Sequence, residues 1–277
     1  MKKVHLAFYA SCSIAFLLSS CSKDQVMDTT ETNTIVSSST IDLINELDFK
    51  TGTQVTFENS LSKSTQITTV KSLVGPCAVI TVDNLTPNSF PKVITIDFGS
   101  GCTTNLFTRK GKLKITLSGL ISTPKATMKI ERENYYVNGL KVEGTIVYSN
   151  ETSTPNVPQW SRTVTNGKLT NLDGIVYFNS GTHIIKQTGG VGTPLLLTDN
   201  TYEMISGNHT VSKENGESVT LTVTAPLVKR YDCNYVSKGN LKVKGALLNG
   251  VIDYGNGECD NKLTYTHENG IVFNLNM

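Results

Sequence analysis

Pairs of carboxylates are the first residues in this chain of 277 that could carry out chemistry. Glycoside hydrolysis uses two carboxyl groups that flank one bond, and Glu131 with Glu133, or Asp97 with Asp253, are the available pairs. Glu131 and Glu133 fall on the polar side of a predicted strand, where glutamates are normally solvated. We therefore expect these carboxylates to be solvated rather than catalytic.

Other catalytic sets are missing from the sequence. Once a leader peptide is removed, the histidines are His183, His209 and His267, and none belongs to a His-Glu-X-X-His motif that could hold zinc. There is no Gly-X-Ser-X-Gly nucleophile elbow and no glycine-rich phosphate loop before a helix. The sequence predicts neither an enzyme nor a metal or cofactor site.

Four cysteines are expected to form two disulfides. The segments 96–102 and 252–259 are nearly duplicated, and each ends in a cysteine that follows another cysteine by 25 or 26 positions. Four cysteines allow three pairings, and the repeated spacing favours Cys77 with Cys102 and Cys233 with Cys259. If the protein is exported, its cysteines can be oxidised to disulfides in the oxidising compartment. The absence of a Cys-X-X-Cys motif argues against a zinc site.

The second copy of this unit also offers oxygen ligands for calcium, in Asp253, Asn256 and Asp260. The first copy has Ser100 in place of Asn256 and nothing that matches Asp260. We therefore prefer a tight hairpin to a calcium loop in this segment.

Aromatic side chains give the best candidates for binding. Tyr135, Tyr136 and Trp160, the only tryptophan, lie in the central part of the chain. Exposed, they could stack on sugar rings or contact a protein; buried, they would belong to the core.

Alternation of apolar and polar residues predicts an all-β fold. Lys112–Ser118 alternates strictly, which is typical of a strand with one wet face. Asn-Gly occurs six times, at 138, 166, 215, 249, 256 and 269, and favours tight hairpins between antiparallel strands. We predict an antiparallel meander, for example residues 128–137 paired with 140–148, that forms either a β-sandwich or an open curled barrel. The only helical candidate is a short one at Thr40–Leu47, with Thr40 as its cap.

The N-terminus resembles that of bacterial lipoproteins. Lys2 and Lys3 precede an apolar run to Leu18 that is too short to span a bilayer. Leu18-Ser19-Ser20-Cys21 resembles a lipobox, which implies cleavage after residue 20 and acylation of Cys21, with palmitate among the expected chains. More than one acyl chain would give stable membrane anchoring.

The predicted domains are therefore a leader at 1–20, a flexible Ser- and Thr-rich tether at 21–40, and one β-domain at 41–277. Lys23-Asp24 resembles part of the export signal of surface lipoproteins in Bacteroidota. Asp28-Thr29-Thr30 fits the O-glycosylation pattern of the same bacteria, with Thr29 as the acceptor.

Charge excludes a nucleic-acid partner. The chain has 25 basic and 23 acidic side chains, and the leader removes two lysines and no acid, so the mature chain is neutral. Without a basic cluster there is no electrostatic footprint for nucleic acid.

Four segments together resemble a group of Bacteroidota-type outer-membrane lipoproteins, over about residues 75–265: they are 109–112, 135–145, 164–170 and 253–262. The resemblance implies a lipid-anchored protein at the outer membrane or cell surface, and it implies no activity.

We accordingly expect a non-catalytic envelope lipoprotein whose β-domain binds a glycan or another envelope protein. The alternative is a carrier that holds a lipid or other apolar ligand in an open barrel.

Overall fold

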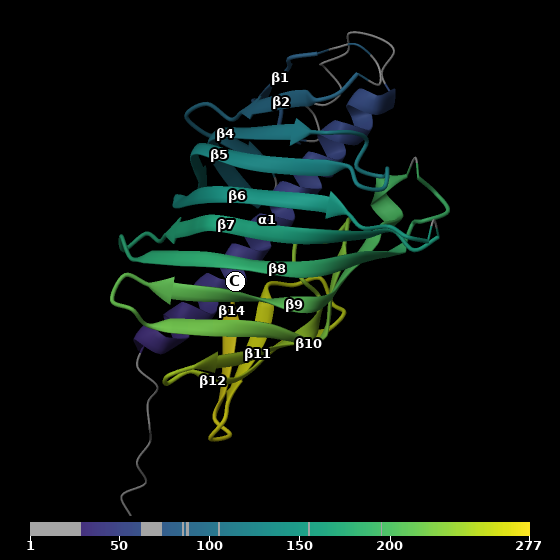
Figure 1. Ribbon diagram of the computed structural model, residues 1–277. Coiled ribbons are helices and arrows are strands. Elements are labelled where there is room, and N and C mark those ends of the chain that lie inside the picture. Colours follow the sequence, from purple (N-terminus) through teal and green to yellow (C-terminus); the bar gives the residue numbers. More distant parts are fainter. Residues whose placement is uncertain are drawn as a thin grey trace, which may run out of the picture.

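The computed structural model describes residues 29–61, 74–84, 86, 89–104, 106–154, 156–194 and 196–277, which form a long helix against an open β-sheet (Figure 1). Helix α1 spans Thr29–Leu61, and a short 3-10 helix, η1, spans Leu197–Asp199. The strands are β1 (Val79–Val82), β2 (Lys92–Asp97), β3 (Cys102–Thr104), β4 (Phe107–Leu117), β5 (Thr127–Val137), β6 (Leu140–Asn150), β7 (Gln159–Thr170), β8 (Val176–Gly189), β9 (Thr201–Lys213), β10 (Ser218–Arg230), β11 (Lys238–Gly245), β12 (Asn249–Asn256), β13 (Lys262–His267) and β14 (Val272–Asn276).

The predicted antiparallel meander is confirmed. Neighbours in the sheet follow chain order from β1 to β14, except that β3 pairs only with β4. The hairpin expected from the sequence is β5 with β6, whose register joins Thr127 to Ser149 and Val137 to Leu140. The sheet is continuous and open, which corresponds to the curled form and not to two separate sheets.

Because neighbouring strands run in opposite directions, the connections between them lie along two opposite sides of the sheet. Short turns join β5 to β6, β7 to β8, β9 to β10, β11 to β12 and β13 to β14 on one side, which we call the turn edge. Longer loops at 118–126, 151–158, 190–200, 231–237 and 257–261 lie on the other side, the loop edge. In Figure 1 the turns between β5 and β10 are at the left and the loops that join these strands are at the right, whereas the β13–β14 turn is at the bottom.

The Asn-Gly pairs have two different roles. Asn138 and Gly139 both have positive φ, 50° and 85°, and form the expected turn between β5 and β6. The pairs at 215 and 269 also lie in turns, but Asn166-Gly167 lies inside β7, where a hairpin prediction is wrong. There the register shifts between Val164 and Gly167, so this pair marks a bulge.

Similar register shifts bend the sheet along a line across several strands. Gly111, Gly144 and Gly239 each sit at a shift and have φ between 82° and 113°. A Cβ on Gly111 would lie 1.9 Å from the carbonyl oxygen of Asn134 on β5. Because bulges bend strands and increase their twist, this row lets the sheet curl around α1.

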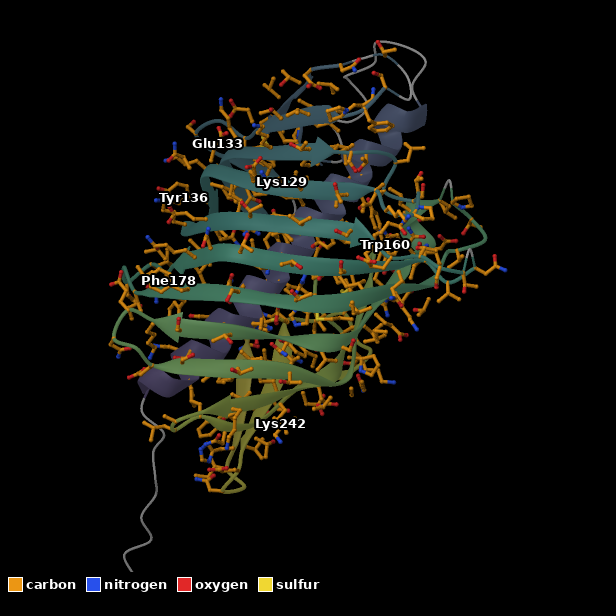
Figure 2. All side chains as sticks on the ribbon, in the orientation of Figure 1. Lys129, Glu133, Tyr136, Trp160, Phe178 and Lys242 are labelled. Carbon is orange, nitrogen blue, oxygen red and sulfur yellow. A yellow bond between two sulfur atoms is a disulfide. The ribbon has the colours of Figure 1, made fainter. Side chains whose placement is uncertain are left out.

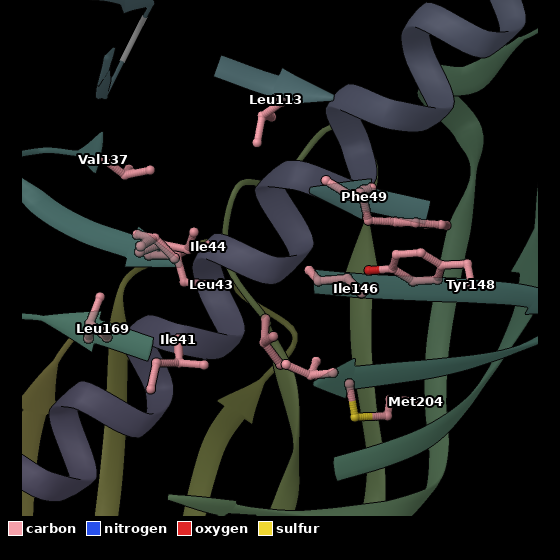
Figure 3. Packing of buried hydrophobic residues seen from close by; sticks show 14 of the residues in the cluster. Ile41, Leu43, Ile44, Phe49, Leu113, Val137, Ile146, Tyr148, Leu169 and Met204 are labelled. Carbon is pink, nitrogen blue, oxygen red and sulfur yellow. The ribbon is translucent and has the colours of Figure 1, made fainter. Parts of the chain in front are cut away.

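Helix α1 crosses the concave face of the sheet and supplies much of the core. Figure 3 shows Phe49 of α1 beside Tyr148 of β6, and Ile41 on the same side of the view as Leu169 of β7. The ring of Phe49 lies 4.6 Å from that of Tyr148, centroid to centroid. Burying one such large apolar side chain stabilises the fold by about 1.5–3 kcal/mol.

The helix is much longer than the sequence predicts. Thr29–Thr40, expected to be part of a flexible tether, forms its first turns, and the proposed helix at Thr40–Leu47 is only its centre. Thr40 is not a cap, since its hydroxyl donates to the carbonyl of Val36 inside the helix. Thr51 likewise donates to Leu47, so these threonines satisfy their own hydroxyls while buried.

Both predicted disulfides, Cys77–Cys102 and Cys233–Cys259, are present. Each pair flanks two adjacent antiparallel strands, β1 with β2 and β11 with β12. The carboxylates of Asp97 and Asp253 make the same local hydrogen bond, to the backbone N–H of Gly99 and Gly255. In the chain-entropy model each loop contributes about 3 kcal/mol of stability.

Candidate functional site

A cavity of about 560 Å³ opens at the loop edge, between the C-terminal half of α1 and three loops of the sheet. Its size is within the range of small-molecule sites. The apolar wall includes Phe49 of α1, Trp160 at the start of β7 and Tyr202 at the start of β9. The remaining lining residues are Thr53, Thr56, Leu120, Ile121, Ser122, Pro124, Thr152, Ser153, Pro158, Gln187, Gly190, Val191, Pro194, Leu197 and Asn200.

Trp160 holds the wall of this pocket in place. Its indole N–H donates to the carbonyl of Ile121 in the β4–β5 loop, at 3.0 Å. The side chain of Asn150 donates to the same carbonyl at 2.7 Å. The Trp160 ring then lies 6.2 Å from that of Tyr202, which in turn lies 5.3 Å from Phe49. Three rings from three distant segments thus form one aromatic surface, and each residue is at most 7% exposed and also belongs to the hydrophobic core.

Polar groups converge beside this surface. Gln187 donates from its Nε2 to Asn200 Oδ1, and Asn200 Nδ2 donates to the hydroxyl of Tyr202 at 2.9 Å. Among the residues that the structure describes, the Tyr202 O–H has no acceptor and Gln187 Oε1 has no donor. Both groups line the pocket, so it offers one hydrogen-bond donor and one acceptor to a ligand.

The pocket is electrically neutral, because no charged side chain lines it. Burial raises the pKa of Tyr202 to about 12, so its hydroxyl stays protonated and able to donate at any physiological pH. An aromatic wall with neutral hydrogen-bonding groups suits a neutral ligand that carries hydroxyls, and gives an ionic ligand no counter-charge.

Away from the pocket, α1 is bound to the sheet by buried ionic contacts. Arg132 on β5 donates to Asp48 at 2.7 Å and to Asn45 at 2.9 Å. Arg162 on β7 donates to Glu46 at 2.8 Å and to Asp42 at 3.3 Å, and its side chain is 1% exposed. Arg132 of β5 thus contacts a later part of α1 than Arg162 of β7 does. These contacts fix the direction in which the helix crosses the sheet.

Two histidines continue this network. Arg162 can only donate, so His183 Nδ1, at 3.2 Å, must accept, and the His183 proton is then on Nε2. That nitrogen faces His209 Nδ1 at 3.4 Å, which places the His209 proton on Nε2. His209 Nε2 in turn lies 3.3 Å from Ser38 Oγ and 3.6 Å from Asp42 Oδ2.

Ser38, His209 and Asp42 do not form a hydrolytic triad. In a triad the serine and the carboxylate contact opposite nitrogens of the imidazole, whereas here both lie beside Nε2. Ser38 is also fully buried, so no substrate reaches its hydroxyl. The cluster therefore has the geometry of a structural network.

Burial lowers the pKa of His183 and of His209, so both stay neutral in the folded protein. An unfolded histidine gains a proton below about pH 6.5, so each of them makes unfolding easier by about 1.4 kcal/mol per pH unit below that value. Burial raises the pKa of Glu46, so above about pH 4.5 the contribution of Glu46 to stability increases as the pH falls. The two histidines act in the opposite direction and outnumber this one carboxyl group. We expect the free energy of unfolding to fall between pH 6.5 and 5.

Urea unfolding at pH 7.5, 6.0 and 5.0 measures this slope. A stability that does not change with pH over this range would show that the two buried histidines titrate normally.

The predicted binding residues are not brought together. Trp160 lines the pocket at the loop edge, but Tyr136 lies at the opposite edge in Figure 2, with Lys110 Nζ 5.2 Å from its ring centroid. Tyr135 belongs to the core, fully buried, and donates to Asp48 Oδ1 at 2.8 Å. Tyr135 is therefore a structural residue and not a binding residue.

The carboxylate pairs are also separate. Glu131 pairs with Lys129 at 2.7 Å, and Glu133 is exposed, in agreement with solvation. Asp97 and Asp253 are on β2 and β12, near opposite ends of the strand order. The part of the chain that the structure covers contains no cluster of His, Cys, Asp or Glu suited to a metal, the 253–260 segment included. Cys21 lies outside the described residues, as does the side chain of Thr29.

Most pocket residues could not be found from the sequence. Phe49, Gln187, Asn200 and Tyr202 come from three separate segments, and only the fold brings them together with Trp160. The one available signal was the presence of Pro158 and Pro194 in long loops at the same edge, since binding residues often lie on such loops.

No known family model, curated protein or solved structure matches the chain. Among residues 29–61 and the other described ranges, no helix is long and apolar enough to cross a membrane.

Proposed function

We propose that this chain is a non-catalytic binding protein, anchored to the outer membrane through an acylated Cys21, whose loop-edge pocket binds a neutral saccharide. The observation that carries the proposal is the aromatic surface of Trp160, Tyr202 and Phe49 beside the neutral pair Tyr202 and Gln187. Sugar rings stack on aromatic faces, and their hydroxyls both donate and accept hydrogen bonds.

A lipid carrier is less well supported by the same geometry. Side chains of α1, among them Ile41, Ile44 and Phe49, fill the concave face of the sheet where an acyl chain would lie (Figure 3). The pocket at the loop edge has a rim that carries the exposed hydroxyls of Ser122 and Ser153. Polar groups at the mouth favour a hydroxylated ligand over an apolar one.

The test replaces Tyr202 by Phe, which removes the free hydroxyl donor and also the hydroxyl oxygen that accepts from Asn200 Nδ2. We expect the affinity for a saccharide identified on a glycan array to fall about fivefold, the effect of one hydrogen bond of about 1 kcal/mol. Titration calorimetry measures the change. Trp160→Ala is a poorer test, since it would also release the Ile121 loop.

Tyr148→Phe is the matched control. Tyr148 is fully buried beside Phe49 in the same aromatic cluster, but it does not line the pocket, so its loss of a hydroxyl should leave saccharide affinity unchanged. Equal losses in the two variants, or no saccharide bound on the array, would contradict the proposal. A co-purified lipid in native mass spectra would favour the carrier instead.

A further inference from the structure

The turn edge exposes more large apolar side chains than its tight turns need. Leu172 in the β7–β8 turn is 75% exposed, Leu247 in the β11–β12 turn 69%, and Val272 after the β13–β14 turn 56%. Phe178, near the start of β8, is 41% exposed and lies at this edge in Figure 2. Exposed apolar residues at three of the turns along one edge are typical of a contact surface, although the β9–β10 turn between them is polar.

The start of α1 lies at the same edge. The C-terminal half of α1 reaches the loop edge, where Phe49, Thr53 and Thr56 line the pocket, so its N-terminal half points the other way. In Figure 1 the helix begins at the lower left, beside β10 and the turns of this edge. Cys21 precedes Thr29 by eight positions, a length of chain that spans at most about 28 Å.

We propose that the turn edge rests on the lipid surface, with Leu172, Leu247 and Val272 in the boundary between headgroups and acyl chains. This inference relies on the acylated Cys21 of the proposed function, because the anchor holds the start of α1, and with it this edge, close to the bilayer. Apolar tips that insert to about 5–10 Å would then fix the orientation of the domain.

The charged residues at the turn edge indicate whether its contact with the lipid surface would be electrostatic or hydrophobic. The turns carry Asp173, Glu214 and Glu268, and Lys110, Lys141 and Lys244 lie on the strands beside them, so this edge has no single sign of charge that would attract or repel anionic headgroups. The contact is therefore hydrophobic and depends on the anchor for its strength. It also turns the loop edge, and the pocket, away from the membrane and toward soluble glycans.

Tryptophan quenching by brominated lipid tests the contact. The protein is produced with its leader, so that it is acylated, and is reconstituted in phosphatidylcholine vesicles with or without bromine on the upper acyl chain. We expect the tryptophan added by Leu172→Trp or Leu247→Trp to lose about twofold or more of its emission in the brominated vesicles. Val157→Trp is the matched control, because Val157 is 42% exposed at the loop edge. The native Trp160 is buried and gives the same background in each variant.

The outcomes separate the two proposals. One outcome is that the protein floats with the vesicles while neither Leu172→Trp nor Leu247→Trp is quenched more than Val157→Trp. That result would support the lipid anchor at Cys21 and contradict the proposed contact between the turn edge and the lipid. If the wild-type protein does not float, the anchor is wrong and the contact fails with it. Saccharide binding, measured in detergent solution, is independent of both results.

Discussion

Replacing Arg162 by Met should lower the free energy of unfolding by about 3–5 kcal/mol, the range found when one partner of a buried ion pair is removed. The arginine is 1% exposed and contacts both Glu46 and Asp42 of α1. Without it, the two carboxylates remain in the core with no arginine between them. Equilibrium unfolding in urea at pH 7.5 measures the loss.

Two further variants show whether the loss comes from charge. Adding Asp42→Asn and Glu46→Gln to Arg162→Met removes the uncompensated charges, and should recover part of the stability. Lys112→Met breaks an exposed pair with Asp97, whose side chains are 46% and 36% exposed, and should cost no more than about 1 kcal/mol. If the triple variant were as unstable as Arg162→Met, packing rather than charge would explain the result.

Gly111→Ala is expected to have an effect of similar size, because it adds an atom where the sheet bends. Gly111 has a φ of 82°, and its Cβ would lie 1.9 Å from the Asn134 carbonyl oxygen. The backbone of β4 or β5 would have to move, which adds overpacking to the cost of the φ angle, together about 3–5 kcal/mol. Thermal unfolding, with circular dichroism to follow the β-sheet signal, measures the loss.

Gly101 is the matched control, since a Cβ there would contact nothing within 4 Å. Gly101→Ala should therefore change stability little. A Gly111→Ala protein as stable as Gly101→Ala would mean that the bulge between β4 and β5 can be removed without opening the curl of the sheet.

The strands could be predicted because each carries its own signal. Residues such as Leu113, Ile115 and Leu117 alternate with polar ones and are all buried, so the period of two identifies both the strand and its inner face. The turn at Asn138-Gly139 could also be predicted from its own two residues, both of which adopt a positive φ. The bulge at Asn166-Gly167 uses the same two residue types, and only pairing with β8 distinguishes it from a turn.

Only the centre of helix α1, at Thr40–Leu47, could be predicted, because the helix as a whole lacks a continuous apolar stripe. A helix on a sheet normally shows apolar residues on one face, but here Asp42, Glu46 and Asp48 also point into the protein. Their burial depends on Arg132 and Arg162, which lie far along the chain. For the same reason, the sequence identified Trp160 as a candidate binding residue but did not indicate the residues that line the pocket with it.

The buried charges of α1 have a consequence for the order in which the chain folds. The helix is synthesised before the sheet, yet its carboxylates meet their arginines only 84 to 120 positions later. Until then a segment rich in Ser, Thr and acids has no reason to collapse or aggregate, and an isolated helix of this composition is only marginally stable. The leading segment can therefore stay unfolded during synthesis, and the domain closes around it once the last strands have been made.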